Sequence, residues 1–595
     1  MIEPRIYRAA LLPVLLAVVL VMFSLENQPR PLAQGLAADA LFDGATGLAI
    51  LRDIVAQAPD RRPGSAGNAA IAGRVAAEFR RSGFSTTTDD FSKGGHDLQN
   101  VIARRPGASR RQIVVMAARD ATSVPDATTS AADTAALLAL ARVFKGRALR
   151  KTIVLVSVDG SSLGDAGARR FAEHEDDRER SDAVLVISSF GARPVAEPLL
   201  IGWSTDASRP DITLRRTALA SLRHEIGGAD HGEGVFEQFA RLSFPLGIGA
   251  QAVLLKRGTE AIRFSGSGEL FPARGDSELA DVDVARLGQL GRALLRTVSA
   301  LDAGRRLDPP GRYLVVARKI VPGWALSTLA LTLTLPTLII ALDGYARLRR
   351  RRQPVAVWSR WLVANSAPWL VGIAVATFLA LLRFADDLPA APNPAAHPFG
   401  VTGAISLCLT VLAIVLAWVF GRRRVMAGVW GRGPLPDAAA PGASGVTALA
   451  LSLAALVIWA LNPFTALALV PALYLWPLAT LAAERGRRTG PLLVVLGAVL
   501  PVTAALIYVE QLSLNPLESV WYAFLLVGGG YPGLVSSLLG CLVLGCLTSV
   551  LAIVAAGLRR RPQVGERPSR SRSIRAPGGY PERGALGGIE SALRR

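Results

Sequence analysis

Two kinds of hydrophobic pattern divide the chain. From Leu36 to about Asp302, short β-branched apolar runs alternate with segments in which apolar residues recur at helical spacing. Gln112–Ala118 and Thr152–Val158 are typical of buried strands, and Ala131–Phe144 between them is typical of a helix packed on those strands. Strand, helix, strand makes a βαβ unit, so this part of the chain is predicted to be an α/β domain.

The functional site of such a domain is expected in the loops that follow its parallel strands. In α/β sheets, ligands bind outside the carboxyl ends of the strands. Here those loops are Arg119–Ser130 and Asp159–Ser162, and a further helix is expected to begin at Leu163 and include Phe171.

The second half of the chain is predicted to be an all-α domain that spans a membrane several times. About 20 consecutive apolar residues are enough to cross a bilayer. Seven such spans are expected, at Trp324–Leu342, Trp361–Leu382, Val401–Phe420, Val446–Leu461, Thr465–Leu481, Pro491–Val509 and Leu534–Leu558. The apolar run Ala9–Leu25 adds an N-terminal span, interpreted as an uncleaved anchor rather than a cleaved signal. Trp521–Val527 is too short to cross and is interpreted as an interfacial or re-entrant piece.

The linkers between the spans predict how the chain crosses the membrane. Basic linkers such as Arg347–Arg352 alternate with acidic or neutral linkers such as Asp386–Gly400 and Glu510–Glu518. Because short basic loops stay in the cytoplasm, both termini are expected to be cytoplasmic. The α/β domain is then expected outside the cell membrane.

Composition agrees with a membrane protein. Hydrophobic residues make up 51% of the 595 residues, and the mean hydropathy is +0.36. The formal net charge of +20 gathers beside the apolar spans, so it indicates retention of basic loops and not nucleic-acid binding. The lipid bilayer and other membrane proteins are the expected partners. All three cysteines, Cys408, Cys541 and Cys546, lie in apolar spans, so no disulfide framework is expected.

These patterns together divide the chain into four parts. The expected parts are an N-terminal transmembrane anchor at 1–35, an extracytoplasmic α/β domain at 36–305, a polytopic membrane domain at 320–558 and a basic, disordered cytoplasmic tail at 559–595.

Several segments of the α/β domain resemble a known family. The matching segments are RRPGSAGNAAIAGRVAAEFRRSGF at Arg61–Phe84, LLALAR at Leu137–Arg142, TIVLVSVDG at Thr152–Gly160 and GAQAVLLKRGTEAIRFSGSGE at Gly249–Glu269. They resemble the M28 zinc aminopeptidase family over about half of the chain. The resemblance implies an α/β domain with a mixed sheet flanked by helices. An M28-like domain followed by several helices is also similar in architecture to the peptidase-like subunit of the GPI transamidase.

The resemblance implies a dinuclear zinc site whose ligands this sequence does not keep. Aligned on the flanking matches, the family's first His falls on Arg119, its bridging Asp on Thr128, and its Glu-Glu pair on Ser161 and Ser162. Its next Asp falls on Ser188 and its final His near Pro272. Hydroxyls are poor zinc ligands beside carboxylate or imidazole. A shifted gap could bring Asp120, Asp126 or Asp133 nearer, but no shift restores a Glu after Asp159-Gly160. We therefore expect no zinc, no catalytic residue, and a degenerate pocket lined by Arg119, Asp120, Ser161 and Ser162, with Arg119 held by Asp120 or Asp159.

Three functions stay open at this point. The preferred one is a non-catalytic, peptidase-derived binding or scaffold module. The second is an active hydrolase or aminopeptidase with a divergent site, using Ser161 or Ser162 as nucleophile. The third is a transporter or channel with an accessory domain, which is weakened because ionisable residues sit only at the rims of the spans. His224 and His231 do not have the spacing of a metal motif.

Overall fold

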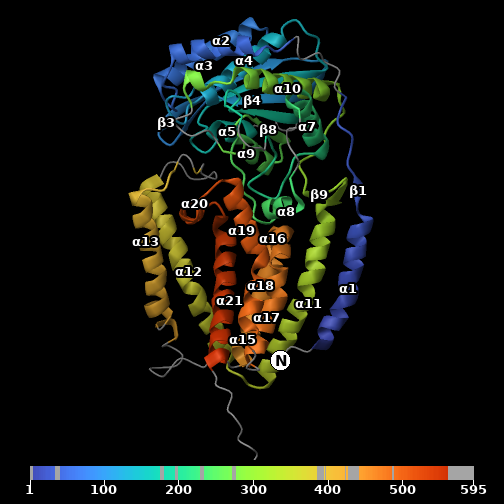
Figure 1. Ribbon diagram of the computed structural model, residues 1–595, viewed down its shortest axis with the longest axis vertical. Coiled ribbons are helices and arrows are strands. Elements are labelled where there is room, and N and C mark those ends of the chain that lie inside the picture. Colours follow the sequence, from blue (N-terminus) through green and yellow to red (C-terminus); the bar gives the residue numbers. More distant parts are fainter. Residues whose placement is uncertain are drawn as a thin grey trace, which may run out of the picture.

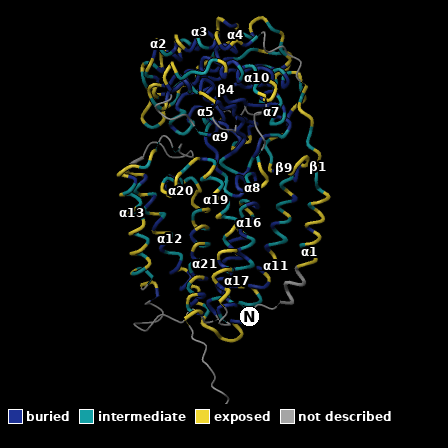
Figure 2. The backbone as a smooth tube through the Cα atoms, in the orientation of Figure 1, coloured by how far each residue is buried: buried dark blue, intermediate teal, exposed yellow. Residues whose placement is uncertain are grey.

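An α/β domain caps one end of a bundle of long helices (Figure 1). The computed structural model describes residues 4–33, 41–173, 180–194, 199–227, 233–270, 277–384, 394, 397–422, 424–426, 441–484 and 488–559. Figure 2 shows burial concentrated inside the α/β domain, while many positions along the long helices are exposed. Exposed Leu, Val and Phe on those helices suit contact with lipid.

The α/β domain is built on a mixed sheet of seven strands. The strands are β2 (Ser85–Lys93), β3 (His96–Arg105), β4 (Ser109–Ala118), β5 (Lys151–Val158), β6 (Ser181–Ser188), β7 (Leu200–Ile201) and β8 (Ala261–Ser265). Their order is β2-β3-β5-β4-β6-β8-β7. The four central strands β5, β4, β6 and β8 run parallel, and β2, β3 and β7 run antiparallel to their neighbours.

Helices cover both faces of this sheet. The helices of the domain are α2 (Gly44–Gln57), α3 (Ala66–Arg81), α4 (Ala132–Val143), α5 (Ala166–Glu173), α7 (Ile212–Ile226), α8 (Val235–Ser243), α9 (Ala250–Lys256) and α10 (Val284–Ala303). Along β4, Ile113 and Val115 pack on the layer of α2, α3, α4 and α10, whereas Val114 and Met116 pack on α5 and α9. This alternation follows from the two-residue period of a strand and buries both faces.

The predicted βαβ unit is confirmed as β4, α4 and β5. The two strands are adjacent and parallel, with Val115 opposite Leu155. The helix expected from Leu163 instead begins at Ala166. Gly164 and Asp165 adopt left-handed φ angles of 72° and 55°, which form a tight turn before the helix can start.

The helical half contains six helices long and apolar enough to span a membrane, or seven if one bent pair counts as a single span, among the residues that the structure describes. The helices are α11 (Gly323–Arg350), α12 (Val355–Phe384), α13 (Val401–Leu416), α15 (Pro441–Leu461), α16 (Pro463–Ala468), α17 (Val470–Glu484), α18 (Gly490–Gly497), α19 (Val499–Gln511), α20 (Pro516–Gly528) and α21 (Gly533–Arg559). α16 and α17 together make one of the six long helices, α18 and α19 make the bent pair, and α20 is too short to span. The six long helices and the bent pair correspond to the seven predicted spans. The N-terminal run forms α1 (Pro4–Phe23), which packs on α11.

Two helices of this half differ from simple spans. The span expected at Pro491–Val509 is bent by 49° between α18 and α19. The short segment Trp521–Val527 lies in α20, a 13-residue helix that begins at an Asn515 cap. α20 lies beside the α/β domain rather than along the bundle (Figure 1). Its length fits the interfacial interpretation.

The α/β domain is docked on the helices through side chains that capture its backbone. Asn462 Nδ2 donates to the Leu242 carbonyl at 2.8 Å, and Tyr508 Oη donates to the Phe244 carbonyl at 2.5 Å. Nearby, Leu246 and Ile248 are buried against aromatic residues of α20. A second, three-stranded sheet of β1 (Glu26–Asn27), β10 (Lys319–Pro322) and β9 (Tyr313–Val316) joins α1 and α11 to the domain.

Candidate functional site

Arg119 is the first residue of the first expected loop, directly after β4, and it is completely buried. Its Nε donates to Asn68 Oδ1 at 2.9 Å, and its Nη1 lies 3.3 Å from Ser157 Oγ. Its Nη2 donates to the Gln99 carbonyl at 2.8 Å and to Asp159 Oδ2 at 3.0 Å. Each nitrogen of the guanidinium is therefore engaged by protein atoms, and Arg119 has the carboxylate partner that its position called for.

Asp159 balances this charge from the end of β5. Besides Arg119, it accepts hydrogen bonds from Asn68 Nδ2 at 2.8 Å, from the Gln99 amide at 3.2 Å and from the Gly160 amide at 2.7 Å. Both side chains of the pair are 1–3% exposed. Burial lowers the pKa of the Arg119 guanidinium, and the negative charge of Asp159 acts in the opposite direction. A dry, fully bonded ion pair of this kind is a fixed structural unit.

Asp120, the next residue, joins the two loops. Its carboxylate accepts from the Ser161 amide and the Ser161 hydroxyl, each at 2.9 Å, and from the Ser162 amide at 3.2 Å. Burial, together with the charge of Asp159, raises the pKa of Asp120 to about 6. The structure thus brings three of the expected residues together: Asp120, Ser161 and Ser162.

The other expected residues do not join this group through hydrogen bonds. Thr128 lies in a π-helical turn and is hydrogen-bonded through its Oγ1 to Ser277 Oγ at 2.9 Å. Ser188 is the buried last residue of β6 and pairs in register with Ser265 of β8. Pro272 lies outside the described residues.

A second buried ion pair was not predicted. Arg61, before α3, donates from Nη2 to Asp126 Oδ2 at 3.0 Å and to the Asp126 carbonyl at 2.8 Å. Ser130 also donates to this carboxylate, through its amide at 3.2 Å and through its hydroxyl. Burial raises the pKa of Asp126, against the opposing effect of Arg61. The two partners are 65 residues apart, so no local pattern could have linked them.

Two further carboxylates lie near the carboxyl edge: Asp133, which the sequence offered only under a shifted alignment, and Asp165, which it did not single out. Asp133 accepts the Ser189 and Phe190 amides at 2.9 Å each, and burial raises its pKa to about 8. Asp165 lies in the left-handed turn before α5, and burial raises its pKa to about 7. The helical periodicity of α4 placed Asp133 at a helix start but gave no sign that it would cap β6.

The residues present do not fit a dinuclear zinc centre. Zinc needs imidazole nitrogen or carboxylate oxygen atoms directed at one point. Arg119 presents a permanent cation, and Ser161 and Ser162 direct their hydrogen-bond donors at the carboxylate of Asp120. Within the described ranges, no group of three His, Cys, Asp or Glu side chains could hold a metal ion.

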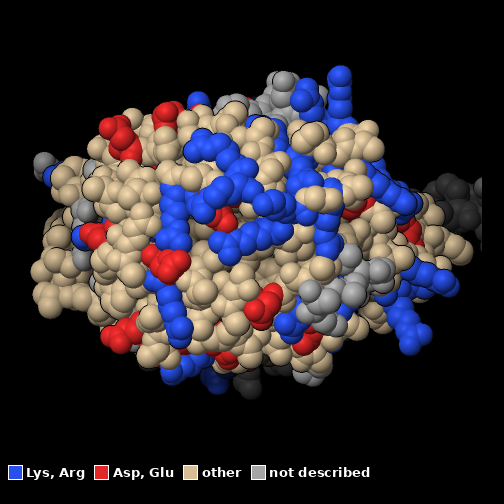
Figure 3. Space-filling model, turned by 90° about the horizontal axis from the view of Figure 1, so that it is seen from above, with Lys and Arg blue, Asp and Glu red and all other residues tan. Residues whose placement is uncertain are grey.

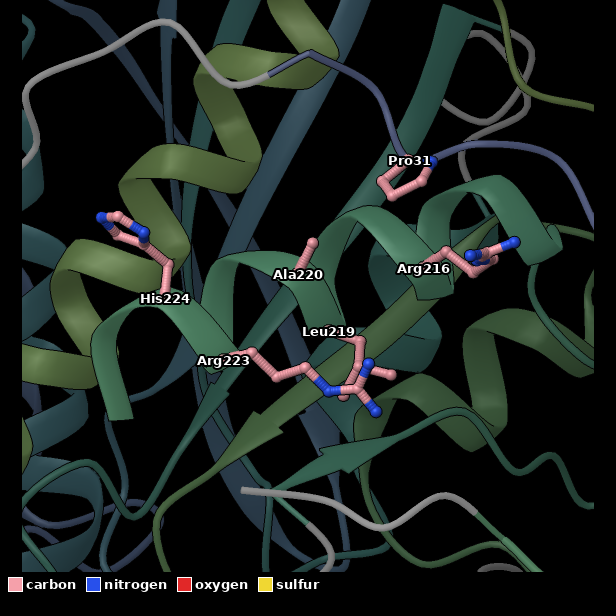
Figure 4. Close-up of a pocket in the computed structure, with 6 residues that line it drawn as sticks. All are labelled: Pro31, Arg216, Leu219, Ala220, Arg223 and His224. Atoms are coloured by element: carbon pink, nitrogen blue, oxygen red, sulfur yellow. The ribbon is translucent and has the colours of Figure 1, made fainter. Parts of the chain in front are cut away.

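A surface pocket of about 360 Å³ lies elsewhere, on the outer side of α7. Figure 4 shows Pro31 of the N-terminal linker facing the α7 residues that complete its lining: Arg216, Leu219, Ala220, Arg223 and His224. The neighbouring Glu225 forms ion pairs with Arg292 at 2.7 Å and Arg296 at 2.5 Å, so it is not available as a ligand beside His224. His231 lies outside the described residues.

Comparisons with known proteins give one family match and several structural neighbours. Residues 100–225, from β3 to α7, match the model of peptidase family M28. The structure is similar to a glutaminyl cyclase from an Acidobacteriales bacterium (16% identity, 47% of this chain, 98% of that chain, TM-score 0.34). It is also similar to a leucine aminopeptidase precursor from Bacteroides thetaiotaomicron (14%, 46%, 98%, TM-score 0.36) and to BSAP, a zinc aminopeptidase from Bacillus subtilis (13%, 45%, 98%, TM-score 0.36). No curated protein matches the chain significantly.

The family match covers the sheet only in part, because β2 and β8 lie outside it, but it includes the βαβ unit and both loops that hold Arg119, Asp120, Ser161 and Ser162. It does not extend into the apolar helices that follow. This protein therefore carries an α/β domain that matches the M28 peptidase family over residues 100–225, joined to a region of several helices that could span a membrane.

Proposed function

We propose that this protein is a multi-pass protein of the cell membrane whose M28-like domain lies outside the cell and acts as a metal-free, non-catalytic binding or scaffold module. One observation carries the proposal. Arg119 stands where the resemblance places the first zinc ligand, and its buried guanidinium is engaged by Asn68, Gln99, Ser157 and Asp159. A guanidinium cannot be deprotonated in a protein, so it opposes a metal cation at that place.

The missing base supports the same reading. Metal-dependent hydrolysis needs a metal-activated water and a carboxylate to take its proton. The residues after Asp159-Gly160 are Ser161 and Ser162, whose amides and hydroxyls hold Asp120. These serines stabilise a carboxylate by donating hydrogen bonds, which is the opposite of the role that the family's Glu pair would play.

The position of basic residues supports the orientation. α11 ends in Arg347, Arg349 and Arg350, and α21 ends in Arg559. Both helices end on the side of the bundle opposite to the α/β domain, where the N-terminus also lies (Figure 1). Because basic ends stay in the cytoplasm, the α/β domain would be on the other side of the membrane.

Metal content is the decisive measurement for the missing site. We expect the full chain, purified in mild detergent with zinc supplied during growth, to contain far less than one zinc per molecule and to release no amino acid from peptide substrates. A zinc aminopeptidase purified in parallel serves as the control. Stoichiometric zinc, or turnover that a chelator abolishes, would show that the loops are misaligned and the domain is an enzyme.

Reporter fusions test the orientation separately. A reporter that is active only in the cytoplasm should work when fused after Arg352 and fail when fused after Asp387. The reverse pattern would move the α/β domain into the cytoplasm.

A second candidate function, a serine hydrolase, is favoured by one contact. Ser161 Oγ donates to Asp120 Oδ2 at 2.9 Å, and a pKa of about 6 would let Asp120 accept the serine proton near neutral pH. A fluorophosphonate probe should label the parent chain and not Ser161→Ala if this function is correct. Labelling that is absent from the parent, or equal in both chains, would exclude Ser161 as the nucleophile.

A further inference from the structure

The α/β domain separates its charges although it carries almost no net charge. Residues 36–305 contain 35 Lys and Arg and 33 Asp and Glu. Neither Leu98–Arg119 nor Thr134–Val158 contains an acidic residue, yet each contains five basic ones. Arg119 follows the carboxyl end of β4, but the other basic residues of these two segments lie at or near the amino ends of β4 and β5. The fold therefore places most of these cations at one edge of the sheet.

Three loops bring these cations onto one continuous surface. Arg105, at the end of β3, donates to the Ser82 carbonyl at 3.5 Å and to the Arg147 carbonyl at 3.2 Å. The Ser109 amide donates to the Arg150 carbonyl at 2.7 Å. The loops after α3, between β3 and β4, and after α4 are therefore packed together. Six exposed or half-buried cations on these loops and on the adjoining ends of α3, β3 and β4 are named the basic edge: Arg80, Arg105, Arg110, Lys145, Arg147 and Arg150.

The nearest acidic side chains already have partners. Glu78 pairs with Arg81 at 2.8 Å and with Arg142 at 2.7 Å. Asp182 is buried and pairs with Arg111 and Lys151. Asp302 accepts the backbone amides of Arg150 and Lys151 at 3.2 and 2.7 Å and brings one carboxylate to the border of the basic edge. No described residue forms an ion pair with a member of the basic edge, so the cluster keeps an excess of positive charge.

The basic edge belongs to the part of the domain turned away from the membrane helices. α3 and α4 lie in the outer helix layer, with the sheet, α5 and α9 between them and the bundle (Figure 1). Figure 3, which views the molecule from that outer side, shows Lys and Arg gathered over the face with few acidic residues among them. This arrangement favours a partner that approaches from outside over the lipid of the protein's own bilayer.

The residue types of the basic edge limit the chemical class of its partner. Five of its six members are Arg, whose planar guanidinium binds phosphate in a bidentate way. The two aromatic residues of these loops, Phe84 and Phe144, are each 3% exposed, so no ring is available to stack on a nucleic-acid base. We infer that the basic edge binds a linear polymer with repeating phosphate groups and no bases.

The test uses the full chain in detergent and fluorescently labelled inorganic polyphosphate as the probe. Binding is measured by anisotropy at several salt concentrations. The test variant carries Arg80→Gln, Arg110→Gln, Lys145→Gln and Arg150→Gln. The control variant loses the same charge at exposed positions away from the cluster, through Lys93→Gln, Lys256→Gln, Arg312→Gln and Arg318→Gln.

The parent chain should bind polyphosphate with an affinity that falls steeply as salt rises. The test variant should bind at least tenfold more weakly and lose roughly three units of the log–log salt slope, because each phosphate contact contributes somewhat less than one unit. The control variant should bind like the parent. An equal loss of affinity in both variants would show that only net charge matters. Tighter binding of single-stranded DNA than of polyphosphate would indicate a nucleic-acid surface. An absence of polyphosphate binding by the parent at physiological salt would show that the basic edge is an ordinary solvated surface. Each of these three outcomes overturns the inference, whether or not the M28-like site is catalytic.

Discussion

Replacing Arg119 by Met should destabilise the α/β domain strongly, because it leaves Asp159 charged and buried. The pair is 1–3% exposed, and its closest nitrogen and oxygen atoms are 3.0 Å apart. Met fills much of the volume of the arginine stem but donates no hydrogen bond. Asp159 would keep three donors, from Asn68, Gln99 and Gly160, and lose its counterion.

The expected loss of folding stability follows from the groups that Arg119→Met leaves without a partner. Removing one partner of a buried ion pair costs about 3–5 kcal/mol, and the Asn68 and Gln99 oxygens that Arg119 satisfied lose a donor as well. A loss of that size is a large part of the roughly 5–15 kcal/mol that stabilises a typical domain. Adding Asp159→Asn removes the stranded charge and keeps an acceptor, so the double variant should recover about 1–3 kcal/mol through the coupling of the two sites.

The assay is denaturant unfolding of the detergent-solubilised chain, followed by resistance of the α/β domain to protease. Arg62→Met serves as the control, since Arg62 and Asp60 form an exposed pair with side chains 64% and 44% exposed and should contribute nothing measurable. The reasoning fails if Arg119→Met is as stable as the parent, or if the double variant is no more stable than the single one.

Three further outcomes are expected. Leu155→Asp places an unpaired charge in the dry centre of the sheet, costs several kcal/mol and should abolish protease resistance; a resistant variant would contradict the β5 assignment. The Asp133 pKa of about 8 in the folded chain lies above the value of 3.8 for a free Asp, so the folded state binds the extra proton and stability falls as pH rises from about 4 to 8. Asp133→Asn should therefore raise the melting temperature more at pH 8.5 than at pH 5.5, and an equal shift at both values would contradict this. Tyr508→Phe removes the hydroxyl that donates to the Phe244 carbonyl and should cost about 1 kcal/mol; amide exchange should then speed up at Leu246 and Gly247 but not in β4, and exchange unchanged at both would refute the docking contact.

The sequence predicts well whatever depends on neighbours along the chain. The β-branched runs around Val115 and Leu155 predicted two buried parallel strands because a strand buried on both faces is apolar at every position. The apolar windows predicted the long helices for the same reason. The bend between α18 and α19 was not predicted, because a hydropathy window averages over the break at Ala498.

Contacts between segments far apart in the sequence were the main features that the sequence did not predict. The candidate loops were located correctly, and the carboxylate beside Arg119 was expected, because both follow from the strand ends. The pairing of Arg61 with Asp126 and the capture of the Leu242 carbonyl by Asn462 join residues 65 and 220 positions apart. Whether the expected pocket residues act as a binding site stays a prediction.

The docking of the segment around Leu246 and Ile248 has a consequence for how the chain is made. The α/β domain leaves the ribosome before α16, α19 and α20 exist, so the apolar side chains that these helices later cover have no partner during that interval. The outer domain can complete its surface only after the last helices have been inserted. A chain that stops after α10 would retain a complete sheet but expose an apolar surface around Leu246 and Ile248. The cell's quality control should recognise such a chain as incompletely folded.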